Sequence, residues 1–212
     1  MLNVDIVSDI VCPWCFIGKR RFAAALALVC RDDPGFSATL RWRPFFLNPD
    51  TPPEGEPYLP FLERKFGSRA AVDALFARVR AAGRAYGIDY AFEAIPLRAN
   101  TLRAHRLIAW AQAQGGAVDD LVEKLFVAQF QSAEYVGDPA VLVRIAGECG
   151  FAADAAAALL AGESGAAEVL ADERQLRALG VSMVPTFILP DGRQVVGAED
   201  PAILAAAMRG AA

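Results

Sequence analysis

The amino-acid sequence predicts an α/β domain that is interrupted by a large, all-helical insertion. Segments in which apolar and polar residues alternate as in strands occur only near the two ends of the chain. The first of these is followed by a helix and a second strand, an order typical of parallel sheets. The roughly 120 residues between the two ends carry helical spacing and capping residues almost throughout. Because neither end holds enough strands for a sheet of its own, we expect the two ends to fold together.

The amino-terminal part is predicted to form a strand, a helix and a second strand. Residues 2–10 are rich in Val and Ile with polar residues between them, which is typical of a strand. Pro13 suits the first position of a helix, where a missing N–H needs no partner, and residues 32–35, Asp-Asp-Pro-Gly, end that helix. Residues 38–43 form the second strand, with an extension across residues 44–47. Parallel pairing of the two strands is expected.

The middle of the chain is predicted to be helical after a short irregular connection. Prolines crowd residues 49–60, where regular structure is not expected. Beyond them, candidate N-cap residues and closing glycines delimit successive helices. These helices run from Ser68 to Tyr86, from Asn100 or Thr101 to Gln114, from Asp119 towards Ser132, from Asp138-Pro139 to Gly150, over residues 152–161 and over residues 165–179.

The carboxyl-terminal part supplies the remaining strands. Residues 186–189 and 194–196 flank the turn sequence Pro190-Asp191-Gly192, which predicts a β-hairpin. Asp200-Pro201 then opens a last helix that ends near Gly210. The predicted domains are a discontinuous α/β domain of residues 1–48 and 165–212 and a helical insertion domain of residues 49–164.

Composition and charge exclude several classes of function. The chain has 212 residues, and 21 Lys and Arg against 25 Asp and Glu give a formal net charge of −4. No basic excess is available for a phosphate backbone, so nucleic acid is not an expected partner. Charged residues interrupt every apolar stretch before the roughly 18 residues that a membrane span needs, so no membrane partner is expected. The chain opens without a secretory signal, and its four cysteines do not suggest an extracellular disulfide framework. We therefore expect a cytoplasmic protein, while the sequence leaves its oligomeric state open.

The motif Cys12-Pro13-Trp14-Cys15 carries the chemistry of the sequence. It falls where the first strand runs into the first helix, with Cys12 near the N-cap and Cys15 one turn further on. Both side chains then lie on one face of the helix, so a disulfide between them is within reach. The free N–H groups and partial positive charge of the helix end favour a thiolate on Cys12. Trp14 adds apolar surface that can cover the sulfur or contact a substrate.

The effect of nearby carboxylates on Cys12 is open. Asp5 and Asp9, if they lie close, oppose a thiolate on Cys12, so the net effect on that thiol stays open.

Two other interpretations of the cysteines are less favoured. A structural zinc site needs four ligands, but Cys30 and Cys149 stand alone and His105 is the single histidine, so no metal is expected. Two inert buried thiols are the remaining alternative. A redox pair is the favoured interpretation.

Five segments of the sequence resemble a known family. They are residues 8–20 (SDIVCPWCFIGKR), 43–49 (RPFFLNP), 100–107 (NTLRAHRL), 137–139 (GDP) and 180–187 (GVSMVPTF). In this order they resemble the DsbA-like thioredoxin-fold proteins, within them the FrnE-like branch related to the 2-hydroxychromene-2-carboxylate isomerases. The resemblance covers most of the chain and implies a thioredoxin fold with a large all-helical insertion.

The resemblance also implies site residues outside the motif. It places a cis peptide bond between Val184 and Pro185, beside the redox pair, where Val184 offers backbone groups to a substrate. Together with Pro13 and Trp14, these two residues are the expected substrate-binding set. His105, a lone histidine among apolar neighbours, is typical of a packing residue, although the resemblance places its helix near the thiols. The residues expected around the site, beyond those that bind substrate, are Asn48, Asn100, Thr101 and His105.

The expected function is thiol–disulfide exchange. Cys12 as a thiolate attacks a disulfide of a protein or small molecule, and Cys15 resolves the mixed disulfide, or the steps run backwards to oxidise a dithiol. No tightly bound cofactor is expected, while glutathione or another thiol is a candidate co-substrate. The cluster Lys19-Arg20-Arg21 is interpreted as a solvated helix face, with guidance of an acidic ligand such as glutathione as the alternative.

A glutathione-dependent isomerase or transferase is the alternative function. Such an enzyme acts on an aromatic or polyketide-like small molecule after the helix end has activated the thiol of glutathione. The resemblance implies that isomerising relatives carry a hydroxyl where Cys12 stands and lack the second cysteine, so this sequence departs from them at both positions. A non-catalytic binding module is the third hypothesis.

Overall fold

Both ends of the chain contribute to one four-stranded sheet, as the sequence predicts. The computed structural model describes residues 1–211. The sheet has the order β2-β1-β5-β6. Strand β1 pairs in parallel with β2, and the hairpin of β5 and β6 joins it through an antiparallel pairing of β1 with β5. These strands span Leu2–Ser8 (β1), Ala38–Pro44 (β2), Thr186–Ile188 (β5) and Gln194–Val196 (β6).

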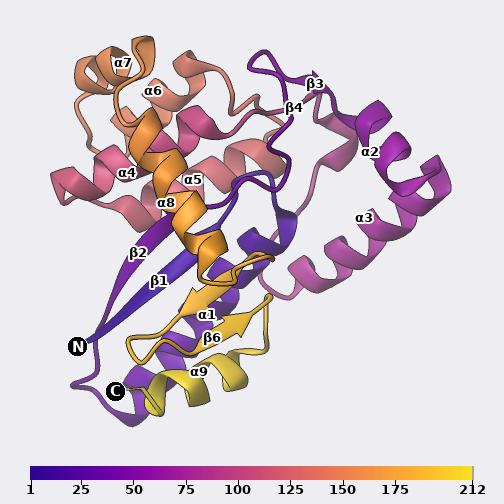
Figure 1. Cartoon of the computed structure of the whole chain (residues 1–212). Coiled ribbons are helices and arrows are strands. Elements are labelled where there is room, and N and C mark those ends of the chain that lie inside the picture. The colour runs from indigo at the N-terminus through magenta and orange to yellow at the C-terminus, as the bar shows by residue number, and fades with distance from the viewer. Residues whose placement is uncertain (212) are drawn as a thin grey trace.

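Helices cover both faces of this sheet. Helix α1 (Pro13–Asp32) packs with α9 (Pro201–Arg209) on one face, and α8 (Ala166–Ala178) crosses the other face near β1 and β2 (Figure 1). Side chains of a strand alternate between the faces. Val4 and Ile6 of β1 therefore enter the core with α1, while Val7 packs with Leu176 of α8.

The remaining helices lie above the sheet and to its right in Figure 1. They are α2 (Tyr58–Phe66), α3 (Arg69–Arg84), α4 (Leu102–Gln114), α5 (Val118–Phe130), α6 (Pro139–Glu148) and α7 (Ala153–Ala161). The Ser68 hydroxyl accepts the Ala71 N–H at 3.2 Å, and the Asp138 carboxylate accepts the Ala140 N–H at 2.8 Å. These caps set the starts of α3 and α6 where the sequence predicts them.

Two sequence-based expectations about the connection after β2 are wrong. The second strand ends at Pro44 instead of continuing across residues 44–47. The proline-rich segment 49–60 is not wholly irregular, because it contains the short strand β3 (Glu56–Pro57) and opens α2. Pro60 is accommodated there because it lies in the first turn of the helix, where its missing N–H costs no hydrogen bond.

Two further short elements were not predicted. Strand β4 (Leu97–Arg98) pairs antiparallel with β3, and a 3-10 turn, η1, spans Phe92–Ala94. No helix within residues 1–211 has the length and apolarity needed to cross a membrane.

One apolar core joins the sheet to the helical part. Phe16 of α1 stacks on Phe126 of α5 with ring centroids 5.2 Å apart, and Phe130 of the same helix lies 6.5 Å away. All three side chains are fully buried. The apolar core is continuous across the predicted domain boundaries, which stay a prediction.

The interpretation of Lys19-Arg20-Arg21 as a solvated helix face is wrong. The Lys19 side chain is 9% exposed, and its ammonium lies 2.8 Å from Asp119 and 3.0 Å from Glu123 of α5. Arg20 also pairs with Glu123, and Arg21 donates to the backbone of the loop before α9. The cluster therefore fastens α1 to its neighbours.

We expect Lys19→Ala to lower the free energy of unfolding by about 2 kcal/mol. The substitution removes a buried ammonium that pairs with Asp119 and Glu123, of which Glu123 keeps its pair with Arg20, and losing a buried ion-pair partner is more costly than losing an exposed one. Arg69, whose pair with Asp73 lies on the surface of α3, provides the control, and Arg69→Ala should cost less than about 0.5 kcal/mol. Urea unfolding of both variants measures the difference. Equal losses in the free energy of unfolding would contradict the stabilising role of Lys19.

Candidate active site

Cys12 is the N-cap of α1 and Cys15 lies one turn inside the helix. The Cys12 backbone is extended, with φ −96° and ψ 110°, and Pro13 follows as the first helical residue. The Cys12 N–H donates to the Asp9 carbonyl at 3.0 Å, and the Cys15 N–H donates to the Cys12 carbonyl at 3.0 Å. The chain therefore turns sharply between strand and helix, and this turn holds the first sulfur at the positive end of α1.

The two thiols have different surroundings. Both are free cysteines, but Cys15 is 1% exposed, and Cys12 alone of the two lines a cavity. Burial raises the pKa of the Cys15 thiol well above its usual value, and the neighbouring Cys12 sulfur raises it further, against smaller opposing contributions from the Asp9 backbone and the Ser8 hydroxyl. Cys12 is therefore the thiol that stands at the cavity, while burial favours the protonated form of Cys15.

The peptide bond between Val184 and Pro185 is cis, as the resemblance implies. It lies beside the thiols, because the Cys12 sulfur is 3.8 Å from the Val184 carbonyl oxygen. Gly18 of α1 packs against the Pro185 ring. A Cβ atom at Gly18 would lie 2.7 Å from the Pro185 Cγ, so only glycine leaves room for the proline.

We expect Gly18→Ala to destabilise the protein by about 1–3 kcal/mol, because the added methyl overpacks the rigid Pro185 ring. Gly147 in α6 is the matched control. Its nearest neighbour would be the Ala153 Cβ at 3.8 Å, an ordinary contact. Gly147→Ala should therefore stabilise by about 0.5–1 kcal/mol through helix propensity. Thermal unfolding of the two variants gives the comparison, and a stabilising Gly18→Ala would refute the packing constraint.

A cavity of about 260 Å³ opens beside Cys12. Trp14 and Val184 border it near the sulfur, and Asn48, which the sequence places around the site, contributes to its wall. The deeper wall is mainly aromatic and aliphatic and comes from α2 and α3. Its principal side chains are Tyr58, Phe61, Leu62, Val72 and Phe76.

Two basic side chains enter this otherwise apolar cavity. Arg98 is 5% exposed, lies 3.6 Å from the Phe61 ring centroid and pairs with Glu56. The Lys65 ammonium donates to the Asn48 side-chain oxygen at 2.8 Å. Burial lowers the pKa of Lys65, and the nearby guanidinium of Arg98 adds to that effect. A group of negative charge in the cavity would relieve this repulsion.

The other residues expected around the site lie apart from this cavity. The Asn100 amide donates to the Thr51 carbonyl at 2.8 Å, and its oxygen accepts the Leu102 N–H at 3.1 Å, which anchors the start of α4. Thr101 is the N-cap of α4 but gives no side-chain cap. His105, 4% exposed, lies 3.5 Å from the buried Asp9 carboxylate and borders a different cavity.

Sequence reasoning missed Lys65 and Arg98. Both lie in segments for which the sequence predicted no element, and nothing in the sequence shows that the two cations meet at one cavity. Asp5, which the sequence left open as a neighbour of Cys12, pairs with Arg41 and Arg43. Burial acts against ionisation there, but the hydrogen bonds of the two arginines outweigh it, so the pKa of Asp5 lies below its usual value.

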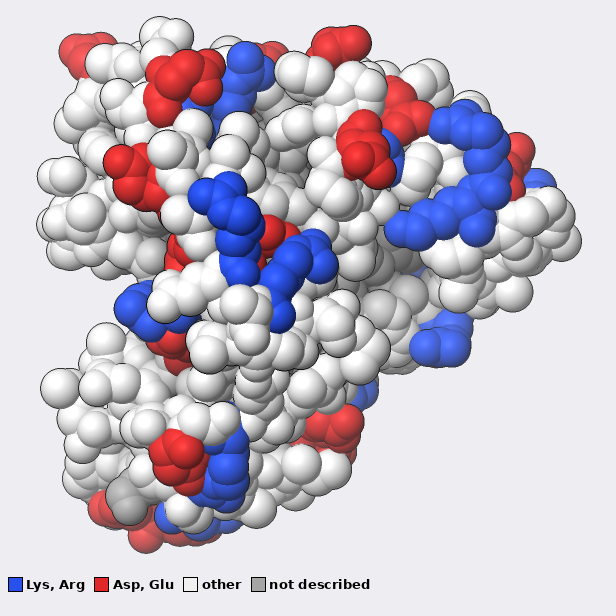
Figure 2. Space-filling model, in the orientation of Figure 1, with Lys and Arg blue, Asp and Glu red and all other residues white. Residues whose placement is uncertain are grey.

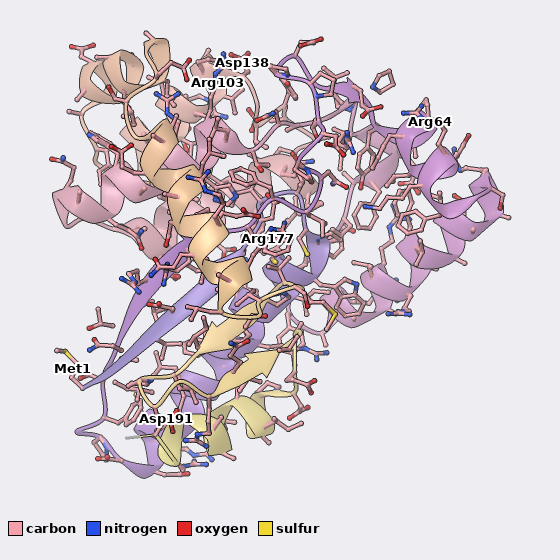
Figure 3. All side chains as sticks on the ribbon, in the orientation of Figure 1. Met1, Arg64, Arg103, Asp138, Arg177 and Asp191 are labelled. Atoms are coloured by element: carbon pink, nitrogen blue, oxygen red, sulfur yellow. The ribbon has the colours of Figure 1, made fainter. Side chains whose placement is uncertain are left out.

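Arg177 of α8 contacts the loop that follows β2. Its guanidinium donates to the Phe46 carbonyl at 3.2 Å and lies 4.4 Å from the Phe45 ring centroid. Figure 3 shows Arg177 at the end of α8 that approaches the start of α1. This contact fixes the loop that carries Asn48.

The surface charge does not form a broad basic face on the side that Figure 2 shows. There, Lys and Arg side chains lie mostly beside Asp and Glu, and much of the surface is uncharged. Among residues 1–211, no group of three or more His, Cys, Asp or Glu side chains is arranged to hold a metal ion.

Comparisons with known proteins agree on the family. The DSBA-like thioredoxin domain matches residues 3–209. A probable DsbA oxidoreductase from Streptomyces coelicolor has 32% identity and a TM-score of 0.90, over 100% of this chain and 90% of that one. The cytosolic disulfide reductase DsbM from Pseudomonas aeruginosa has 19% identity and a TM-score of 0.69, over 99% and 98% of the two chains.

Two further proteins match over most of the chain. A 2-hydroxychromene-2-carboxylate isomerase structure has 17% identity and a TM-score of 0.70, over 98% of this chain and 95% of that one. The uncharacterized protein YwbO from Bacillus subtilis is 23% identical over 191 residues, 90% of this chain and 88% of its own. The family match and the 32% identity, each spanning nearly the whole chain, establish that this protein belongs to the DSBA-like thioredoxin family.

Proposed function

We propose that the protein is a thiol–disulfide oxidoreductase that works through Cys12 and Cys15. The observation that carries the proposal is the difference between the two thiols. Cys12 stands at the positive end of α1 and borders a cavity, while burial keeps Cys15 behind it and protonated. Two cysteines with these separate roles are what a two-step exchange requires.

The reaction follows from this arrangement. The Cys12 thiolate attacks one sulfur of a substrate disulfide, forms a mixed disulfide and releases the other sulfur as a thiol. Cys15 then loses its proton and attacks the Cys12 sulfur, which frees the second substrate thiol and leaves a disulfide between Cys12 and Cys15. The Val184 carbonyl beside the Cys12 sulfur is placed to accept a hydrogen bond from substrate backbone. Two molecules of a second thiol then reduce the pair in two further exchanges, leave as their own disulfide and complete the cycle.

The cavity suggests the chemistry of that second thiol. Lys65 and Arg98 favour an anionic group, and the Cys12 sulfur borders the same space. Glutathione carries carboxylates and a thiol, and a structure of DsbM contains it. We propose glutathione or a similar anionic thiol as co-substrate in a cytoplasmic setting, and a protein or small-molecule disulfide as the partner.

The aromatic wall of the cavity supports one alternative function. An isomerase or transferase that uses glutathione on an aromatic small molecule would need such a wall, and a 2-hydroxychromene-2-carboxylate isomerase shares the fold. The presence of Cys15 favours redox chemistry, because isomerisation leaves a resolving thiol without a role.

Reduction of a protein disulfide by glutathione tests the proposal. The wild-type protein should accelerate insulin reduction, and the Cys12→Ser variant should not. A variant that keeps its activity would overturn the assignment of Cys12. A wild-type protein that does not reduce insulin but converts aromatic substrates in the presence of glutathione would support the isomerase.

A further inference from the structure

A buried tyrosine, Tyr90, reaches the redox motif with its hydroxyl. The Tyr90 hydroxyl donates a hydrogen bond to the Pro13 carbonyl at 2.7 Å, across 77 positions of the sequence. Tyr90 lies between α3 and η1 and is 3% exposed. The helix does not need this hydrogen bond, because a carbonyl in its first turn accepts the N–H four residues further on. The contact therefore adds something to the motif beyond helix formation.

Packing against several elements fixes the Tyr90 ring. The ring stacks on Phe92 of η1, with centroids 4.6 Å apart. It meets Phe16 of α1 and Phe130 of α5 edge-on, at 6.3 and 5.5 Å between centroids. Gly83 of α3 passes so close that a Cβ atom there would lie 2.6 Å from the ring. The surrounding side chains therefore hold the hydroxyl in its direction, and the hydrogen bond to the motif is not what places the ring.

The backbone and the proton of Tyr90 are held as well. Arg80 of α3 donates two hydrogen bonds to the Tyr90 carbonyl, at 3.2 and 3.1 Å, and also pairs with Glu93. Burial raises the pKa of the Tyr90 hydroxyl, and negative charge on Cys12 or Cys15 raises it further. The hydroxyl therefore keeps its proton at neutral pH and remains a hydrogen-bond donor.

The Pro13 carbonyl belongs to the same peptide unit as the Trp14 N–H. Proline has no N–H to offer the Cys12 sulfur, and the Cys15 N–H donates to the Cys12 carbonyl at 3.0 Å. Trp14 occupies the second helical position, whose N–H is a usual donor to the side chain of an N-cap residue. When Cys12 ionises, its sulfur becomes an acceptor. The Trp14 N–H is therefore the backbone donor available to the thiolate.

We propose that Tyr90 is a positioning residue that strengthens the Trp14 N–H as a donor to the Cys12 thiolate. A hydrogen bond accepted at one end of a peptide unit polarises that unit, so the N–H at its other end becomes a stronger donor. The contacts run from the Tyr90 hydroxyl through the peptide unit of Pro13 and Trp14 to the sulfur. The inference rests on the proposed function, because it takes Cys12 as the attacking thiol.

Other polar and charged groups also surround Cys12. The Val184 carbonyl oxygen, 3.8 Å from the sulfur, favours the thiol over the thiolate. The Asp9 carboxylate, which precedes the motif, accepts the Leu47 N–H at 2.8 Å. The remaining titratable groups are Lys65, Arg98 and Tyr58 at the cavity, Cys15 in the motif and Arg78 over the Trp14 ring. A Tyr90→Phe substitution replaces none of these residues, so it isolates the contribution of one hydroxyl.

Alkylation of Cys12 by iodoacetamide, followed across pH by mass spectrometry of its peptide, measures formation of the thiolate. We expect Tyr90→Phe to raise the pH midpoint of this reaction by about 0.5 unit and to slow alkylation about threefold below the midpoint. Above the midpoint, the equilibrium of the Cys12 and Cys15 pair with glutathione should shift about threefold toward the disulfide, because the reduced form loses stabilisation. A purely structural role of Tyr90 would lower the free energy of unfolding and leave the midpoint unchanged.

Tyr58→Phe is the matched control. Tyr58 is also buried and borders the cavity at Cys12, but within residues 1–211 its hydroxyl makes no hydrogen bond to the motif. Its loss should move the midpoint by less than about 0.2 unit. Circular dichroism checks the fold of both variants. If Tyr90→Phe does not fold, 3-fluorotyrosine is incorporated into the Tyr58→Phe protein, where the stronger donor at position 90 should lower the midpoint.

The outcomes separate this inference from the proposed function. An unchanged midpoint in a folded Tyr90→Phe variant, equal shifts in Tyr90→Phe and Tyr58→Phe, or a midpoint that does not fall with 3-fluorotyrosine overturns the role of Tyr90. A wild-type protein in which Cys12 reacts no faster than Cys149 at the same pH instead refutes Cys12 as the attacking thiol.

Discussion

The Cys12→Ser variant is expected to lose disulfide-exchange activity by about a thousandfold or more. A serine hydroxyl is not ionised near neutral pH and cannot form a disulfide with a substrate sulfur, so neither step of the exchange can begin. Residue 12 should remain the N-cap of α1 in this variant, because Cys12 makes no side-chain cap and Pro13 still opens the helix. Insulin reduction with glutathione as the reductant measures the loss.

The Cys15→Ser variant should behave differently from Cys12→Ser. It retains the attacking thiol, so it should form the mixed disulfide but fail to resolve it. Mass spectrometry should then find one substrate thiol bound per chain. Cys149→Ser is the control, because Cys149 ends α6, does not border the cavity at Cys12, and burial raises the pKa of its thiol. An adduct on Cys149, or an active Cys12→Ser variant, would contradict the assigned roles.

The sequence predicted those parts of the fold that local chemistry determines. Ser68, Asp138 and Asp200 each cap a helix through their own side chain, so their positions could be predicted without knowledge of the tertiary structure. The parallel pairing of residues 2–8 with 38–44 followed from the strand–helix–strand order. The short strands β3 and β4 were missed, because two residues in each are held only by pairing with a segment distant in sequence.

The candidate site divides in the same way. Cys12 and Cys15 are neighbours on one helix turn, so their spacing alone indicates a pair. The contact of Cys12 with Val184 joins distant segments, and only the resemblance predicted it. The approach of Asp9 to His105 and the cavity that contains Arg98 also depend on packing between elements, for which a single sequence carries no signal.

The Lys65→Gln variant is expected to discriminate between anionic and neutral disulfides. Lys65 borders the cavity at Cys12 although much of the residue is exposed, and partial burial together with the nearby guanidinium of Arg98 lowers the pKa of its ammonium. Removing it should lower kcat/KM for glutathione disulfide about tenfold, which corresponds to about 1.4 kcal/mol. Hydroxyethyl disulfide, which has no charge, should change less than twofold. Steady-state assays with both disulfides give the ratio.

The adjacent Arg64 supplies the control for this prediction. Arg64 pairs with Glu56, does not border the cavity, and is seen on α2 in Figure 3. Arg64→Gln removes the same charge from the same helix, so any effect of net charge on the approach of an anionic substrate appears equally in both variants. Two results together would place the anionic group of the substrate inside the cavity. The loss of kcat/KM must occur in Lys65→Gln and not in Arg64→Gln, and the wild-type kcat/KM for glutathione disulfide must fall as salt is added. Equal losses in the two variants would show that the cavity recognises its substrate through the aromatic wall instead, the result that favours a neutral disulfide or an aromatic ligand.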